Sequence, residues 1–152
     1  MASKDLYIFD LDGTLADHHH RVHYVMTEKK KDQDWDAFYQ ACDKDYPVYA
    51  TINTLRKLEA AGAEIWIFSG RSDVVRSKTE MWLAKAGIIY SWLQMRSAGD
   101  YTKDDELKLE WYNNMLQEDV DRLVAVFEDR DRMVRMWRSI NVPCFQVAPG
   151  DF

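Results

Sequence analysis

Five short apolar segments recur along the chain, and each gives way to polar residues or glycine. Runs of this length, rich in β-branched and aromatic residues, are typical of buried strands. The segment Glu64–Phe68 is the clearest of them and Trp92–Met95 is the weakest. We therefore predict strands over Leu6–Phe9, Glu64–Phe68, Trp92–Met95, Leu123–Phe127 and Cys144–Val147.

The stretches between these segments carry apolar residues three and four positions apart, which is the spacing of one helix face. Gly62 follows the first of them and suits a helix C-terminus, as Gly87 does for the second. We interpret the tryptophans and methionines in these stretches as core packing. The helices are marked by Ile52, Leu55 and Leu58; by Val75, Thr79, Trp82, Leu83 and Ala86; by Leu107, Trp111, Met115 and Leu116; and by Met133, Val134, Trp137 and Ile140.

Strands separated by single helices indicate right-handed crossovers. The pattern thus predicts an α/β fold with a doubly wound (Rossmann-like) parallel five-stranded sheet and helices on both faces. In such folds, ligands bind beyond the carboxyl ends of the strands. Polar or charged residues stand at these ends, so we expect a functional site there: Asp10-Leu11-Asp12, Ser69-Gly70-Arg71, Met95-Arg96 and Glu128-Asp129.

Residues 16–48 interrupt the alternation with a polar insert that is rich in His, Lys and Asp, and Asp34–Cys42 within it predicts a short helix. Because the insert follows the first strand end, we expect a small cap or lid within a single domain over residues 1–152, although a plain surface excursion gives the same pattern. Three consecutive side chains cannot all face one ion, so we interpret His18-His19-His20 as loop. One of them, or His23, is a candidate substrate contact.

The composition narrows the classes of protein. The chain has 152 residues and a net charge of −6, from 20 Lys and Arg against 26 Asp and Glu. This balance argues against binding long nucleic acid by charge alone, but it permits a locally basic pocket. No run approaches the ~20 apolar residues of a membrane span, and no secretory signal is visible. Cys42 and Cys144 form no CxxC motif, so we expect reduced thiols in a cytoplasmic protein.

The most specific motif is Phe9-Asp10-Leu11-Asp12-Gly13-Thr14-Leu15, directly after the first strand. It resembles the first motif of the haloacid dehalogenase (HAD) superfamily of phosphohydrolases. A carboxylate here can attack phosphorus in line and form an aspartyl-phosphate. A second carboxylate two residues on can protonate the leaving oxygen and then deprotonate the attacking water. The resemblance implies Asp10 as the nucleophile and Asp12 as the acid and base, with Gly13 allowing the sharp turn.

Three further motifs of the superfamily match. Ser69 is implied to bond a phosphoryl oxygen, with a helix that begins near Ser72 or Asp73 aiming backbone N–H groups at the same phosphate. Lys108 is implied as the cation that offsets charge on the nucleophile and the phosphoryl group, with Lys103 as the competing choice. The fourth motif supplies carboxylates for Mg²⁺, which prefers oxygen ligands.

That fourth motif departs from the commoner Asp-Asp pair, since this chain has Glu128-Asp129. Asp129 is the better ligand, so the implied metal residues are Asp10, Asp12 and Asp129. Glu128 either binds through water or only tunes the site. We expect Asp131 to cap the following helix rather than to bind metal.

Within the superfamily, the chain looks like the 3′-phosphatase domain of phage polynucleotide kinase-phosphatases. The resemblance implies that Arg71 and Asp104 matter for activity, and we take Gly70, Arg71, Arg96, Asp104 and Arg21 as substrate-binding candidates, since a guanidinium can hold phosphate bidentately. A solvated surface position is the alternative for Arg96 and Arg21. We derive no catalytic role for the residues near the C-terminus, Cys144–Ala148 and Gly150-Asp151-Phe152. The matching residues are Ser69-Gly70-Arg71, Arg96, Gly99-Asp100, Lys103-Asp104-Asp105, Lys108, Glu128-Asp129-Arg130, Met136-Trp137-Arg138, Cys144–Ala148 and Gly150-Asp151-Phe152.

We therefore expect a Mg²⁺-dependent phosphomonoesterase that removes 3′-phosphates from nucleic-acid ends or nucleotides, without a long nucleic-acid footprint. The chain has no GxxxxGK[ST] P-loop, so we expect any kinase activity on another chain. One alternative is a phosphatase for small phosphomonoesters such as 5′-nucleotides. Another is a phosphate-binding module without catalysis, although such a module is expected to lose Asp10 or Asp12. The oligomeric state stays open.

Overall fold

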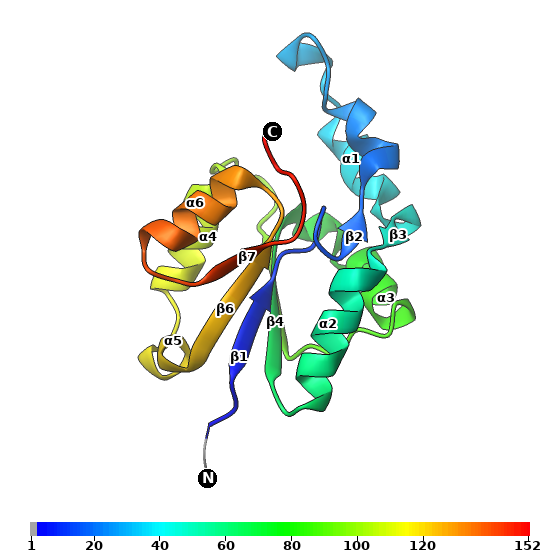
Figure 1. The fold of residues 1–152 in the computed structure, drawn as a ribbon. Helices are drawn as coiled ribbons and strands as arrows, with labels where there is room; N and C mark the ends of the chain where they lie inside the picture. The colour runs from blue at the N-terminus through cyan, green and yellow to red at the C-terminus, as the bar shows by residue number, and fades with distance from the viewer. Residues whose placement is uncertain (1–2) are drawn as a thin grey trace.

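The computed structural model describes residues 3–152, and its main sheet contains the five predicted strands. They lie in the order β5-β4-β1-β6-β7, and every neighbouring pair is parallel (Figure 1). The predicted sheet is therefore confirmed, with β1 at its centre. The strands are β1 (Leu6–Phe9), β4 (Glu64–Ser72), β5 (Trp92–Arg96), β6 (Leu123–Glu128) and β7 (Cys144–Gln146).

Helices cover both faces of the sheet. Alternate side chains of a strand point to opposite faces, so Phe9 packs into the core beneath α2 (Tyr49–Ala60) and α3 (Arg76–Lys85), whereas Ile8 packs into the core beneath α4 (Asp104–Asn113) and α6 (Asp131–Ser139). The tryptophans predicted as core residues include Trp137, which is fully buried, and Trp82. The short helix α5 (Gln117–Arg122) was not predicted, and it has no buried residue whose periodicity would reveal it.

The insert forms a small substructure at the carboxyl end of the sheet. Its two ends pair as an antiparallel ribbon of β2 (Ala16–Asp17) and β3 (Tyr46–Pro47), and Figure 1 shows the rest projecting beyond the strand ends. The predicted helix is confirmed as α1 (Trp35–Gln40), which begins after Asp34 because that carboxylate accepts a hydrogen bond from the Ala37 N–H at 2.9 Å. The remaining turns are the 3-10 helices η1 (His19–Tyr24), η2 (Lys30–Asp32) and η3 (Ala41–Lys44). The histidine run is thus loop only in part.

Strand β4 runs past its predicted end at Phe68. Its register with β5 shifts between Ser69 and Ser72, so an irregular segment continues the pairing as far as Ser72. The 3-10 turn η4 (Asp73–Val75) follows, and α3 begins only at Arg76. Helical structure thus begins at Asp73, as predicted, but its first turn is a 3-10 helix and the α-helix itself begins at Arg76. The Ser72 hydroxyl caps the 3-10 turn by accepting from the Val74 N–H.

Within residues 3–152, none of the helices has the length and apolar character that a membrane crossing needs.

Candidate active site

Three carboxylates meet where β1 and β6 end side by side. Asp10 follows β1, whereas Glu128 ends β6 and Asp129 follows it, and one oxygen from each lies within 4.8 Å of the others. All three residues are buried. We call this group the carboxylate cluster. The parallel pairing of β1 with β6 produces it, because neighbouring parallel strands place their carboxyl ends together.

Lys108 neutralises part of this charge. Its Nζ donates to Oδ1 of Asp10 and to Oε1 of Glu128, both at 2.8 Å, and the residue is only 2% exposed. Burial alone would lower the pKa of Lys108, but the charges of Asp10 and Glu128 outweigh it and raise the pKa. Lys103, the competing choice, is exposed just before α4. The lysine of the site is therefore Lys108.

The donor set of the carboxylate cluster fits a hard divalent cation. Three carboxylates face one ammonium group, which leaves two negative charges uncompensated when all are ionised. Burial and the neighbouring charge of Asp10 accordingly raise the pKa values of Glu128 and Asp129. Oε2 of Glu128 is buried without a hydrogen-bond partner among the described residues. Oxygen ligands and excess negative charge are what Mg²⁺ requires.

The turn after β1 is shaped to admit Asp129. Gly13 has a φ of +81°, and a Cβ atom at that position would lie 2.0 Å from Oδ2 of Asp129. Glycine is therefore needed for both conformation and space. The Thr14 hydroxyl donates to Oδ2 of Asp10 at 2.9 Å and lies 3.4 Å from Oδ1 of Asp129.

The carboxylate of Asp12 lies outside the carboxylate cluster, because two arginines hold it. Its Oδ1 accepts from Nη2 of Arg21 at 2.7 Å, and from Nε and Nη2 of Arg71 at 3.0 and 2.7 Å. Glu128 occupies the place in the cluster that the sequence assigned to Asp12. Burial would raise the pKa of Asp12, but the charges of Arg71 and Arg21 and a hydrogen bond from Arg71 lower it below the usual range. Asp12 is therefore ionised at neutral pH.

A fourth partner, Asp45, completes this arrangement, and the sequence reasoning missed it. Its carboxylate is fully buried; Oδ1 accepts from Arg21, and Oδ2 accepts from both Arg21 and Arg71. We call Asp12, Asp45, Arg21 and Arg71 the arginine cluster. Two carboxylates face two guanidinium groups, so its charges balance without a metal. Asp45 sits in a polar stretch of the insert that resembles surface loop, and the only signal for it was two motif arginines without an assigned counter-ion.

The alternative of a solvated surface position for Arg21 and Arg96 is wrong, since both are buried. Arg96 donates to the carbonyl oxygens of Gly70, Asp100 and Thr102 and to the carboxylate of Asp104. Its guanidinium thus ties β4 to the loop before α4. Arg21 and Arg71 likewise donate their hydrogen bonds to protein groups, because a buried guanidinium group must be paired. Direct phosphate binding by these arginines stays a prediction.

Ser69 and Gly70 lie on the irregular end of β4. The buried Ser69 hydroxyl accepts from the Arg71 N–H at 3.2 Å, which leaves its own hydrogen available to donate. A Cβ atom on Gly70 would lie 2.8 Å from Oδ1 of Asp104, so glycine allows this carboxylate to approach β4. The predicted site residues therefore gather at one end of the sheet.

The fold and these clusters define a HAD-type phosphatase, a phosphoric monoester hydrolase. A class C acid phosphatase from Bacillus anthracis, solved with tungstate bound, shares the fold with a TM-score of 0.57 at 18% identity, covering 87% of this chain and 54% of that chain. Residues 4–152 match the family model of the polynucleotide kinase PNKP phosphatase domain. The chain belongs to this family, which confirms the resemblance seen in the sequence.

Two relatives are more similar. A chain of the Pnkp1/Rnl/Hen1 RNA repair complex has a TM-score of 0.82 and 30% identity, covering 99% of this chain and 46% of that chain. The "Putative bifunctional polynucleotide kinase/RNA ligase" of Autographa californica nuclear polyhedrosis virus is 33% identical over 135 residues, which are 88% of this chain and 18% of that protein. The chain therefore spans less than half the length of either relative.

Proposed function

We propose that this chain is a Mg²⁺-dependent phosphatase that removes 3′-phosphates from nucleic-acid ends or nucleotides through an aspartyl-phosphate on Asp10. The observation that carries the proposal is the environment of Asp10. Lys108 donates a hydrogen bond to one of its carboxylate oxygens and Thr14 donates to the other. The Asp10 carboxylate is therefore held in place at the carboxyl end of the parallel sheet. Such fixation lowers the entropic cost of reaching an in-line geometry.

The proposed reaction has two steps. An oxygen of Asp10 attacks phosphorus, the ester P–O bond breaks, and the leaving oxygen takes a proton from Asp12. A water molecule then attacks the aspartyl-phosphate, gives a proton to Asp12 and releases phosphate, which restores Asp10. Because Asp12 is ionised when the site is free, it takes up the proton for the first step from solvent as the substrate binds. The negative charge of the phosphate beside its carboxylate raises the pKa of Asp12 and favours this uptake.

The remaining side chains support this chemistry. Asp10, Glu128 and Asp129 would hold Mg²⁺, which when bound offsets the negative charge of the phosphoryl group. Lys108 adds positive charge beside the nucleophile, and the Ser69 hydroxyl is placed to donate to a phosphoryl oxygen. Arg21 and Arg71 orient Asp12 through Oδ1, which leaves Oδ2 to exchange the proton.

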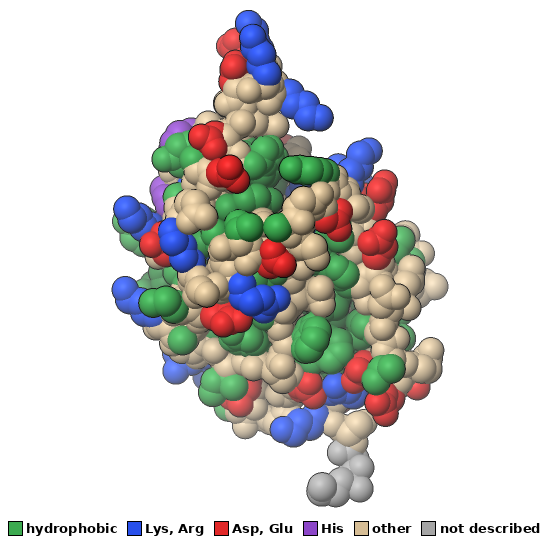
Figure 2. All heavy atoms as spheres, turned by 180° about the vertical axis from the view of Figure 1, so that it is seen from behind, with side chains coloured by type: hydrophobic (Ala, Val, Ile, Leu, Met, Phe, Trp, Pro, Cys, Tyr) green, Lys and Arg blue, Asp and Glu red, His purple; other side chains and the backbone are tan. Residues whose placement is uncertain are grey.

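Two observations support nucleic-acid ends as the substrate class: the family match and the distribution of charge on the surface. The matched family is a polynucleotide kinase phosphatase domain, and one relative is a chain of an RNA repair complex. Figure 2 shows basic and acidic side chains interspersed on one face and on the projecting insert. This pattern suits contact with the end of a nucleic-acid chain rather than binding along a long stretch of it. We propose that the insert is a small cap over the carboxyl end of the sheet. The buried free thiols of Cys42 and Cys144 suit a cytoplasmic enzyme.

A substrate panel tests the proposal. Phosphate release is measured with Mg²⁺ on 3′-phosphorylated DNA and RNA oligonucleotides, 3′-TMP and 5′-TMP, for the wild-type chain and for Asp10→Asn. We expect release from the 3′-phosphates and none from Asp10→Asn or after chelation. Preferred release from 5′-TMP would reassign the enzyme to small phosphomonoesters. Tight binding of 3′-phosphorylated ends without turnover would indicate a non-catalytic module, and full activity of Asp10→Asn would overturn the mechanism.

A further inference from the structure

The C-terminal string, which the catalytic motifs do not explain, packs against the turn that carries Asp129. Strand β7 pairs with β6 so that Gln146 is in register with Glu128, and the Val147 N–H extends the ladder to the Glu128 carbonyl at 2.9 Å. The chain then crosses the turn between β6 and α6. We call residues 146–152 the C-terminal strap and residues 128–131 the metal-binding turn.

The strap touches the backbone of this turn directly. The Gly150 carbonyl accepts from the Asp131 N–H at 2.7 Å. A Cβ atom on Gly150 would lie 1.9 Å from the Asp129 carbonyl oxygen and 2.5 Å from Cα of Arg130. Only glycine therefore lets the two backbones approach so closely. At the end of the strap, the carbonyl of Phe152 accepts from Nε of Arg130 at 2.6 Å.

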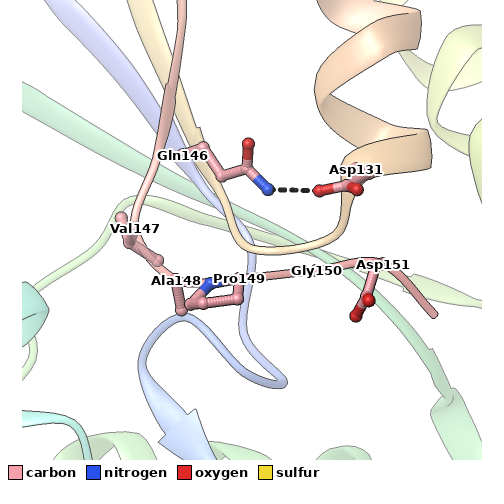
Figure 3. Close-up of a pocket in the computed structure, with 7 residues that line it drawn as sticks. All are labelled: Asp131, Gln146, Val147, Ala148, Pro149, Gly150 and Asp151. Atoms are coloured by element: carbon pink, nitrogen blue, oxygen red, sulfur yellow. Dashed lines mark hydrogen bonds between the residues drawn. The ribbon is translucent and has the colours of Figure 1, made fainter.

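Gln146 is the side chain that joins the strap to the turn. Its Nε2 donates to Oδ1 of Asp131 at 2.6 Å (Figure 3). The same atom donates to the main-chain oxygen of Asp129 at 2.9 Å. The two hydrogens of one amide group thus hold two successive parts of the turn. Asp131 was expected to cap α6, but it is the first residue of that helix and its side chain makes no capping bond.

We infer that Gln146 is a positioning residue that sets the place of the Asp129 carboxylate for the metal, by holding the Asp129 carbonyl and the start of α6. The inference rests on the magnesium site of the proposed function. Outer partners that orient metal ligands affect metal affinity by about 10- to 100-fold when they are removed.

The surroundings of Gln146 separate this role from a purely structural one. Gln146 is exposed, and together with Asp131 and residues 147–151 it lines a hollow of about 580 Å³ (Figure 3). Replacing its amide therefore leaves no cavity in the core. Gln117 provides a matched control, because it too is exposed and its Nε2 donates to a carboxylate, Oδ1 of Asp121, at 2.8 Å.

The test compares Gln146→Met and Gln117→Met in the full chain. Binding of Mg²⁺ is measured by calorimetry and binding of Mn²⁺ by electron paramagnetic resonance, with thermal unfolding recorded in chelator. We expect the Kd for both ions to rise about tenfold in Gln146→Met only. The Tm without metal should match that of Gln117→Met, and excess Mg²⁺ should restore kcat on a 3′-phosphorylated oligonucleotide.

An unchanged Kd in Gln146→Met, beside a wild-type chain that binds metal and releases phosphate, would overturn this role and leave the proposed function standing. A fall in Tm without metal, with no change in Kd, would also overturn it and make the contact structural. A wild-type chain that binds neither ion would overturn both the inference and the magnesium site on which it rests.

Discussion

Asp45 of the insert is bound to Arg21 through two hydrogen bonds, from Nε to Oδ1 at 2.8 Å and from Nη2 to Oδ2 at 2.7 Å. The same Nη2 atom also reaches Oδ1 of Asp12. A residue of the insert thus acts, through one guanidinium group, on the carboxylate proposed as acid and base. The insert is therefore more than a covering for the site, because it supplies part of the framework that orients Asp12.

Replacing Asp45 by Asn tests this connection. Asn keeps the shape but removes the charge that pairs with two buried arginines, so we expect the free energy of unfolding to fall by about 3 kcal/mol. Because Arg21 and Arg71 then lose their fixed place, phosphate release should slow by about 100-fold. Urea unfolding and steady-state kinetics measure the two effects.

Asp43→Asn is the matched control for this change. Asp43 lies on the 3-10 helix η3, which ends just before Asp45, but it is exposed, and its ion pair with Lys78 spans 4.0 Å. We expect its free energy of unfolding to stay within about 0.5 kcal/mol of wild type. Wild-type turnover in a folded Asp45→Asn variant would show that Asp45 does not orient Asp12.

The Lys108 ammonium joins Asp10 and Glu128 of the carboxylate cluster. Lys108→Met leaves Asp10 and Glu128 without their shared partner, so we expect a loss of about 3 kcal/mol in the free energy of unfolding at neutral pH. Adding Glu128→Gln removes one of the unpaired charges and should recover part of that loss. Lys103→Met serves as the exposed control. Equal stabilities of the single and double variants would contradict this charge balance.

The effect on stability of the limited space beside Gly13 can be measured separately from the effect of its left-handed backbone conformation. Gly13 and Gly99 have nearly the same φ, +81° and +82°, but a Cβ atom on Gly99 would meet nothing within 4 Å. Gly99→Ala should therefore lose only the roughly 1–2 kcal/mol of a left-handed conformation. Gly13→Ala should lose more than that, and its Mg²⁺ affinity should fall, because the new methyl group displaces Asp129. Calorimetry and urea unfolding check both; equal losses would contradict the contact.

The two thiols are expected to react slowly in the folded chain. Burial raises the pKa of Cys144 to about 12, and it also raises the pKa of Cys42. Because the thiolate is the reactive form, modification by a disulfide reagent at pH 8 should be at least about 100-fold slower than in the urea-unfolded chain. Rapid modification of one thiol in the native protein would show that its surroundings open readily.

Much of the fold and of the site was accessible from the sequence because the relevant signals are local. The strands β1, β4 and β6 each contain a continuous apolar run, and the polar residues that follow the predicted strands meet at the carboxyl end of the sheet. The turn after β1 was equally clear, since Asp10, Gly13 and Thr14 lie within five positions of one another. The end of β4 was misjudged because an irregular pairing with β5, and not hydrophobicity, carries the strand to Ser72.

The roles of Asp12 and Glu128 needed the tertiary structure. From the sequence, Asp12 was expected to bind the metal, and Glu128 was expected either to bind it through water or only to tune the site. In the folded chain, Arg21 and Arg71 neutralise Asp12, whereas Glu128 shares one lysine with Asp10. The balance of charge in each cluster therefore separates a proposed acid and base from a proposed metal ligand, and that balance depends on residues distant in sequence.

The order of the five main strands and of the longer helices, the family, and the choice of Asp10, Lys108 and Asp129 as candidates were accessible from the sequence alone, because short-range hydrophobic patterning and turn residues specify these features. Only the tertiary structure brought Asp45 against Arg21 and Arg71 and laid the C-terminal strap across the turn that carries Asp129. Both arrangements join segments that no local pattern relates. An unpaired buried charge is strongly destabilising, so each buried charged group needs a partner of opposite charge. Which residue is close enough to be that partner depends on the folded chain.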